Sequence, residues 1–187
     1  MTLRKIQITG EPVLHERATA VQVIDDYVRD LVTDMFETMD AAPGVGLAAT
    51  QIGVGLRIFV FSYGFEDQTI RGVAINPKLS LSEISDEELD EDADAEGCLS
   101  IPGERFPLKR ADRTTLIATD LDGTEYQIKA EGWLARIFQH EFDHLEGMLY
   151  ADRLVKPHKR LMNKAIKENG WGKPGSSWLP GKDYLEP

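Results

Sequence analysis

Apolar residues recur at helical spacing in an early segment of the chain. Over residues 25–40 the apolar positions fall three or four apart behind an acidic start, which predicts an amphipathic helix. These positions are Val28, Leu31, Val32, Met35, Phe36 and Met39. Pro43 and Gly44 follow, and because both residues disfavour helical continuation, we expect the helix to end there.

The middle of the chain carries the patterns of strands. Residues 57–63 and 72–76 are short apolar runs rich in β-branched or aromatic residues, so each run predicts a strand. Residues 114–119 and 125–129 flank Asp122-Gly123, a dipeptide that favours a tight turn. Together these last two segments predict a hairpin.

Helical spacing returns later in the chain. Residues 132–146 are predicted to form a helix that stops at Gly147, and another helix is predicted to begin at Pro157 and to end at Asn169-Gly170. Strands followed by a helix that packs on them favour an α+β fold. We therefore expect antiparallel β-sheets around a central α-helix, with further helices in the N-terminal and C-terminal parts of the chain.

The composition is that of a globular protein. Of the 187 residues 42% are hydrophobic, and we expect residues 1–170 to form one catalytic domain and residues 171–187 a Gly/Pro-rich tail. The N-terminus lacks the apolar stretch of a signal peptide, and no apolar run is long enough to span a bilayer. A single cysteine excludes an internal disulfide, which suits the reducing cytoplasm in which we expect the protein to act.

Charge is unevenly distributed along the chain. The net charge of −11 argues against broad nucleic-acid affinity, and residues 83–96, which contain no lysine or arginine, predict a solvated, flexible loop. Basic residues gather in and around the last predicted helix. They are Lys156, Lys159, Arg160, Lys164, Lys167 and Lys173. This segment is either a solvated amphipathic helix whose Leu161, Met162 and Ile166 cover the core, or a surface that docks on an anionic partner.

The predicted helix over residues 132–146 contains two histidines and a glutamate in a pattern typical of metal hydrolases. His140 and His144 lie one helical turn apart, so both can bind one divalent cation, with Glu141 beside them as a general base. Asp143 is available to orient a ligand by accepting a hydrogen bond. The segment therefore predicts a hydrolytic metal site.

A catalytic metal usually has three protein ligands, so this pattern needs one more. A metzincin-type protease would have a histidine where this chain has Tyr150. A thermolysin-like protease would use a later glutamate, for which Glu168 is the candidate. The only cysteine, Cys98, is the third possibility, because a thiolate is a good ligand for zinc or ferrous iron.

Three motifs that occur in order along the chain bear on this choice. They are Gly44-Val45-Gly46-Leu47-Ala48-Ala49-Thr50-Gln51, Glu96-Gly97-Cys98-Leu99-Ser100 and Gln139-His140-Glu141-Phe142-Asp143-His144-Leu145-Glu146-Gly147. Together they resemble the signature motifs of bacterial, type I-like peptide deformylases. The resemblance extends to residues 10–14, 75–77 and 149–154 and covers the chain to about residue 165.

The resemblance implies a metal ion held by Cys98, His140 and His144, with Glu141 as the base that takes a proton from water. It also implies Fe2+ as the metal of the active enzyme, while this ligand set would accept Zn2+, Ni2+ or Co2+ as well. The chemistry expected from these four residues is amide hydrolysis.

The substrate follows from the resemblance too, as N-formylmethionyl peptides that lose their formyl group as formate. In the family's pattern the Gln51 side chain and the Leu99 backbone N–H stabilise the charge that builds on the carbonyl oxygen. Substrate contacts are expected at Gly44, Val45, Gly46, Gly97, Arg136 and Ile137. The glycines among them permit close approach of an extended peptide.

Two other functions stay open at this point. A zinc endopeptidase would share the metal helix but would cleave unformylated peptides at internal bonds. A catalytically idle relative would act as a binding module, because the resemblance implies that the basic C-terminal helix could contact ribosomal RNA.

Overall fold

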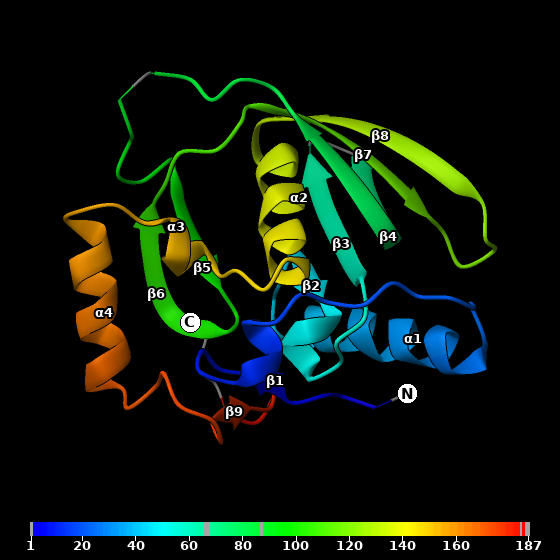
Figure 1. Ribbon diagram of the computed structural model, residues 1–187, viewed down its shortest axis with the longest axis horizontal. Coiled ribbons are helices and arrows are strands. Elements are labelled where there is room, and N and C mark those ends of the chain that lie inside the picture. Colours follow the sequence, from blue (N-terminus) through cyan, green and yellow to red (C-terminus); the bar gives the residue numbers. More distant parts are fainter. Residues whose placement is uncertain (1, 66–67, 87, 184, 186–187) are drawn as a thin grey trace.

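Within the described residues, 2–65, 68–86, 88–183 and 185, the computed structural model has a five-stranded antiparallel sheet against which helix α2 (Gly132–Leu145) packs (Figure 1). The strand order is β2-β3-β4-β7-β8. These strands are β2 (Gly46–Ala48), β3 (Ile58–Phe65), β4 (Gln68–Leu81), β7 (Arg113–Thr119) and β8 (Glu125–Glu131). Because α2 contacts every one of them, the predicted α+β fold around a central helix is confirmed.

Two-stranded sheets and further helices surround this centre (Figure 1). Strand β1 (Ile6–Gln7) pairs with β9 (Ser177–Trp178), and β5 (Ala95–Cys98) pairs with β6 (Ile101–Pro107). The helices besides α2 are α1 (Asp26–Ala41), α3 (Tyr150–Arg153), α4 (His158–Glu168) and the 3-10 turns η1 (Pro12–Leu14) and η2 (Ala49–Ile52). None of the helices in the described ranges combines the length and apolarity needed to cross a membrane.

Helix α1 forms where the apolar spacing predicts it. Its first turn is capped by Asp25, whose carboxylate accepts a hydrogen bond from the Val28 N–H at 3.0 Å, and this cap satisfies a backbone donor that would otherwise lack a partner. Apolar side chains on its inner face, including Met35 and Met39, are fully buried. The predicted N-terminal helix is therefore confirmed to within one residue at each end.

The strand predictions also agree with the structure, although one strand is longer than its pattern. The run over residues 72–76 lies inside β4, which continues to Leu81. The hairpin between β7 and β8 turns at Gly123, whose φ of 81° requires glycine for an unstrained turn. Helix α2 stops before Gly147, which also has a left-handed φ of 74°, as the sequence predicts.

An aromatic cluster fixes how α2 sits on the sheet. Phe138 of α2 is fully buried and lies edge-on to Phe61 of β3, with ring centroids 5.0 Å apart. Phe59 completes the contact at 6.2 Å from Phe138. Truncation of such a phenylalanine to alanine typically costs about 3–5 kcal/mol, so this face of the helix is strongly held. The His140 and His144 side of α2 is thereby directed away from the sheet.

The C-terminal segment contains the predicted helix α4, but one predicted core contact is wrong. Met162 is fully buried and Ile166 packs on the core cluster, whereas Leu161 is 48% exposed. Adjacent residues of a helix point about 100° apart, so Leu161 cannot share the buried face of Met162. Beyond α4, Trp178 lies in the core with 3% exposure.

The acidic segment over residues 83–96 forms hydrogen bonds within itself. The Asp90 carboxylate accepts hydrogen bonds from the backbone N–H groups of Asp92 and Ala93, which makes a local turn. Glu87 lies outside the described residues, as do Tyr184, Glu186 and Pro187 of the tail. The flexibility predicted for this segment stays a prediction.

Candidate metal centre and active site

Three potential metal ligands from two elements converge at the centre of the fold. His140 and His144 project from α2, and Cys98 ends β5. The ligand atoms of these residues all lie within 4.8 Å of one another, and Cys98 Sγ is 3.4 Å from His144 Nε2. The β5–β6 pairing changes register after Gly97, which is the local irregularity that lets Cys98 approach the helix.

The competing third ligands do not join this cluster. Tyr150 stacks beside the His140 ring, but its hydroxyl donates a hydrogen bond to the Glu104 carbonyl at 2.7 Å. Glu168 lies on the exposed surface of α4, where its partner is Lys164. Both alternatives are therefore set aside in favour of Cys98.

The donor set fits a divalent transition metal. One thiolate and two imidazoles suit Zn2+ and Fe2+, while hard cations such as Mg2+ prefer oxygen ligands. The site is also buried, and Glu141 Oε2 beside it has no hydrogen-bond partner among the described residues. A buried, unpartnered carboxylate oxygen costs free energy unless a polar species meets it, so the pocket is built to hold one.

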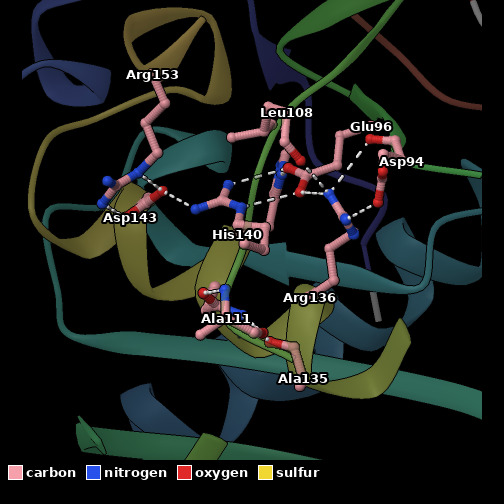
Figure 2. Close-up of polar contacts among 11 residues, drawn as sticks. Asp94, Glu96, Leu108, Ala111, Ala135, Arg136, His140, Asp143 and Arg153 are labelled. Carbon is pink, nitrogen blue, oxygen red and sulfur yellow. Dashed lines mark hydrogen bonds and ion pairs between the residues drawn. The ribbon is translucent and has the colours of Figure 1, made fainter. Parts of the chain in front are cut away.

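Glu96 orients the first of the two histidines (Figure 2). Its carboxylate is 97% buried and lies 3.0 Å from His140 Nδ1. Burial alone would raise the pKa of the Glu96 carboxyl, but hydrogen bonds from His140 and Arg110 outweigh it and hold the pKa well below its usual range. Because an ionised carboxylate can only accept, Nδ1 carries the proton and Nε2 is left to bind a metal.

Asp143 does not orient a histidine, which corrects the prediction made for it. Its carboxylate instead accepts hydrogen bonds from Arg110 at 2.6 Å and from Arg153 at 2.5 Å (Figure 2). Arg110 bridges the two carboxylates, because its other nitrogens bind Glu96 at 2.9 and 3.0 Å. The orienting role thus belongs to Glu96.

Sequence reasoning missed Glu96 and Arg110 as functional residues. The available signal was Glu96 itself, an acidic residue inside the same short motif as Cys98. Arg110 had no signal of its own, since a single arginine outside any motif is usually a surface residue.

Glu141 is placed to act as a base. Its side chain is 96% buried, and burial raises the pKa of its carboxyl to about 7, although a bound cation would lower that value. The carboxylate lies against Gly46, where a side-chain Cβ would come within 2.3 Å of Oε1. Only glycine at position 46 therefore leaves room for Glu141 in this position.

Gln51 is fixed with its amide nitrogen toward the cysteine. Its Oε1 accepts a hydrogen bond from the Ala48 N–H at 2.8 Å, so the NH2 group must face the other way. That nitrogen lies 3.7 Å from Cys98 Sγ and 3.4 Å from Ser100 Oγ. A donor is therefore held next to the candidate metal centre.

A cavity of about 310 Å³ opens beside these groups. It is lined by Gln51, Cys98, Leu99, His140 and Glu141, and by every residue predicted to contact substrate. Those are Gly44, Val45, Gly46, Gly97, Arg136 and Ile137. Ala42, Pro43, Glu96, Arg105 and Trp133 also line it and had not been predicted. Gly46, which lines the cavity, begins β2, a terminal strand of the central sheet.

Comparison with known proteins identifies the family. The sequence model described as polypeptide deformylase matches residues 3–160. The chain belongs to the polypeptide deformylase family. It is 48% identical over 192 residues to a peptide deformylase of Mycobacterium sp. (strain JLS), covering 98% of this chain and 97% of that protein. It is 49% identical over 185 residues to peptide deformylase 2 of Corynebacterium efficiens, covering 98% and 96%.

The fold agrees with that of solved deformylases. The structure of peptide deformylase from Ehrlichia chaffeensis in complex with actinonin matches with a TM-score of 0.77 and 37% sequence identity, over 90% of this chain and 98% of that chain. Polypeptide deformylases are metal-dependent hydrolases that remove the N-formyl group of nascent peptides. This is the enzyme activity that family membership gives the chain, and it takes precedence over the endopeptidase and binding-module alternatives.

One residue that lines the deformylase cavity, Arg136, is charged. Arg136 lines the cavity, and its guanidinium binds Asp94 at 2.6 Å, Glu96 at 3.0 Å and the Leu108 carbonyl at 2.8 Å (Figure 2). The charge is thus neutralised by internal partners. The methylene stem of an arginine paired in this way can serve as apolar lining.

Proposed function

We propose that this deformylase hydrolyses the formyl amide of N-formylmethionyl peptides at the Cys98, His140 and His144 centre, releasing formate and a free amino terminus. The observation that carries the proposal is the convergence of these three ligand atoms within 4.8 Å of one another. Beside them lie a buried carboxylate, Glu141, and a fixed amide donor, Gln51.

Cys98, His140 and His144 would hold the metal, which would supply the Lewis acidity that lowers the pKa of water. Glu141 accepts the proton that the attacking water loses and then gives it to the leaving amine, as its buried position favours. The Gln51 amide and the Leu99 backbone N–H donate to the oxygen on which negative charge develops. Loss of one such donor typically costs about 2.7–4 kcal/mol of barrier.

The cavity gives the substrate its orientation. Strand β2 is a terminal strand, so an extended peptide can pair with its free edge near Gly44 and Gly46. The methionine side chain then enters the space lined by Val45, Ile137 and the Arg136 stem. A formyl carbon carries only hydrogen, and a confined site beside the ligands admits it more readily than a larger acyl group.

Fe2+ is the metal we propose for the active enzyme. The thiolate and imidazole donors support it, and they would also accept Zn2+, Ni2+ or Co2+. Activity of protein loaded with each metal in turn, under anaerobic conditions, decides among them. A single thiolate of this kind is best preserved in a reducing compartment, which supports a cytoplasmic location.

A ribosomal contact through α4 is a separate proposal. Its support is the exposed basic surface of Lys156, Arg160, Lys164 and Lys167, with Met162 turned inward. Lys159 contributes less, because its ammonium group donates to the Ala151 carbonyl at 2.6 Å. Replacing the four exposed residues by glutamate should abolish co-sedimentation with ribosomes while hydrolysis of a free peptide is retained, and unchanged sedimentation would refute the contact.

The activity is tested by formate release from a short formyl-Met peptide with anaerobically purified, iron-loaded protein. Glu141→Gln should keep the metal and lose nearly all turnover, because the proton acceptor is removed. The same peptide without its formyl group is the control, and cleavage of that peptide would support an endopeptidase instead.

A further inference from the structure

The C-terminal tail makes a hydrogen bond to the active-site segment. The indole N–H of Trp178 donates to the backbone carbonyl of Leu99 at 2.8 Å. Trp178 is 3% exposed and packs in the same hydrophobic cluster as Leu47, which lies within the motif that contains Gln51, and Ile52, which follows that motif. Leu99 itself lines the cavity. The two residues are 79 positions apart in the sequence, so this contact joins distant parts of the chain.

Pairing between the two ends of the chain holds Trp178 in place. Strand β9 is antiparallel to β1, with Trp178 opposite Ile6 and Ser177 opposite Gln7 (Figure 1). The Ile8 N–H extends this pairing by donating to the Ser176 carbonyl at 3.0 Å. A tail held by backbone hydrogen bonds and a buried indole has little freedom to move.

The N-terminal segment binds the next peptide group of the same active-site loop. The Thr9 N–H donates to the Ser100 carbonyl at 2.8 Å, and the Thr9 carbonyl in turn accepts from the Gly172 N–H of the tail at 2.9 Å. Consecutive carbonyls, those of Leu99 and Ser100, are therefore each fixed by a donor from outside the loop. The Leu99 N–H belongs to the preceding peptide group, between Cys98 and Leu99, and Cys98 is held in β5 by pairing with β6. Because Cys98 is held on one side and the Leu99 carbonyl on the other, the φ and ψ of Leu99 between them have little freedom, which restricts the direction of the Leu99 N–H.

A close approach at Gly10 shows how tightly the tail is seated. A Cβ on Gly10 would lie 2.2 Å from the Lys173 nitrogen and 2.4 Å from the Gly172 carbonyl carbon, so no larger residue fits without moving the tail. The φ of Gly10, 106°, is also one that other residues rarely adopt. The residue after Gly10, Glu11, also binds the tail, because its carboxylate accepts a hydrogen bond from the Gly175 N–H.

We propose that Trp178 is a positioning residue for deformylation, because its indole N–H fixes the Leu99 carbonyl and so, with Cys98 held at the end of β5, restricts the Leu99 N–H to the direction of the developing oxyanion. This inference rests on the role proposed above for Leu99. Leu99 lies within residues 3–160, which the family model matches, whereas Trp178 lies beyond them. The tail is then part of the catalytic framework.

The test compares Trp178→Phe with a matched change in the same tail, Trp171→Phe. Phenylalanine retains an aromatic ring in the core but cannot donate to Leu99. Trp171 also packs on the core, and it has no hydrogen bond to residues 98–100 among the described residues. For each iron-loaded variant, kcat and KM for a formyl-Met peptide are measured with metal content and thermal midpoint.

We expect Trp178→Phe to lower kcat about 10-fold with KM and metal content unchanged, less than the 10²–10³-fold typical for complete loss of an oxyanion donor. Trp171→Phe should leave kcat within about two-fold of the parent. An unchanged kcat in Trp178→Phe, or an equal fall in both variants, would overturn the positioning role.

A second measurement keeps the proposal independent of turnover. In 15N-labelled protein, Trp178→Phe should shift and broaden the backbone amide signals of Leu99 and Ser100, while Trp171→Phe leaves them in place. If the parent protein does not release formate, the proposed function fails, and these signals still report whether Trp178 fixes the loop. Unperturbed signals at both positions would refute it.

Discussion

Nδ1 of His140 lies 3.0 Å from the Glu96 carboxylate, which is itself held by two arginines. This contact sets the tautomer and the ring orientation of His140, although Glu96 is not one of the three candidate metal ligands. Hydrogen bonds from His140 and Arg110 hold the pKa of the Glu96 carboxyl well below its usual range, against the effect of burial, so the carboxylate is ionised and can accept. The geometry of the metal site thus depends on Glu96, Arg110 and Arg136, none of which is a candidate metal ligand.

Glu96→Gln is expected to weaken metal binding. The amide loses the negative charge that pairs with Arg110 and orients His140, and loss of such a partner typically lowers metal affinity about 10–100-fold. Competition between the apo-protein and a chromogenic chelator measures this affinity. The exposed Glu88→Gln is the matched control and should bind metal like the parent. Equal affinity in both variants would show that Glu96 has no orienting role.

Cys98→Asp is expected to retain part of the metal affinity and to lose most of the activity. A carboxylate can ligate the same cation, but it replaces a soft, polarisable thiolate with a hard oxygen donor and changes the distance to the metal. Metal content by mass spectrometry and formate release, measured on the same sample, separate the two effects. Full activity with a fully occupied site would count against Cys98 as a ligand.

Arg110→Leu is expected to destabilise the protein strongly. The arginine is 93% buried between Glu96 and Asp143, and removal of one partner from a buried ion pair typically costs about 3–5 kcal/mol. Urea unfolding of the metal-loaded protein gives the free energy. Lys164→Ala, which breaks an exposed pair with Glu168, serves as control and should change the free energy by about 0.5 kcal/mol or less. Similar losses in the two variants would contradict the importance of the buried network.

The sequence predicted the elements whose pattern is local. Helix α1 and the β7–β8 hairpin follow from periodicity and from the turn at Gly123, because one face of each is buried. The prediction that Leu161 covers the core was wrong. Two adjacent residues of α4, Leu161 and Met162, are apolar, so the sequence does not tell which of them faces the core, and in the structure it is Met162.

The site likewise has a part that a local sequence pattern predicts and a part that depends on tertiary packing. The His140 and His144 pair is readable from helical spacing, whereas the proximity of Cys98 depends on a register change between β5 and β6 that no local pattern encodes. Contacts between residues far apart in the sequence could not be predicted for the same reason. Asp143 faces Arg110 and Arg153 because of tertiary packing, and Trp178 reaches Leu99 from the far end of the chain.

Gly46→Ala is expected to displace the catalytic base while leaving the metal ligands in place. The new methyl group would overlap Glu141 Oε1, which lies 2.3 Å from the Cβ position, so the carboxylate must turn away from the cavity. We expect kcat to fall at least about 100-fold, near the lower limit of what a positioned general base contributes. Gly55→Ala is the matched control, because a Cβ there meets nothing within 4 Å. If Gly46→Ala turns over formyl-Met peptide at the rate of Gly55→Ala, with equal metal content, then Glu141 does not act from the position that the structure gives it.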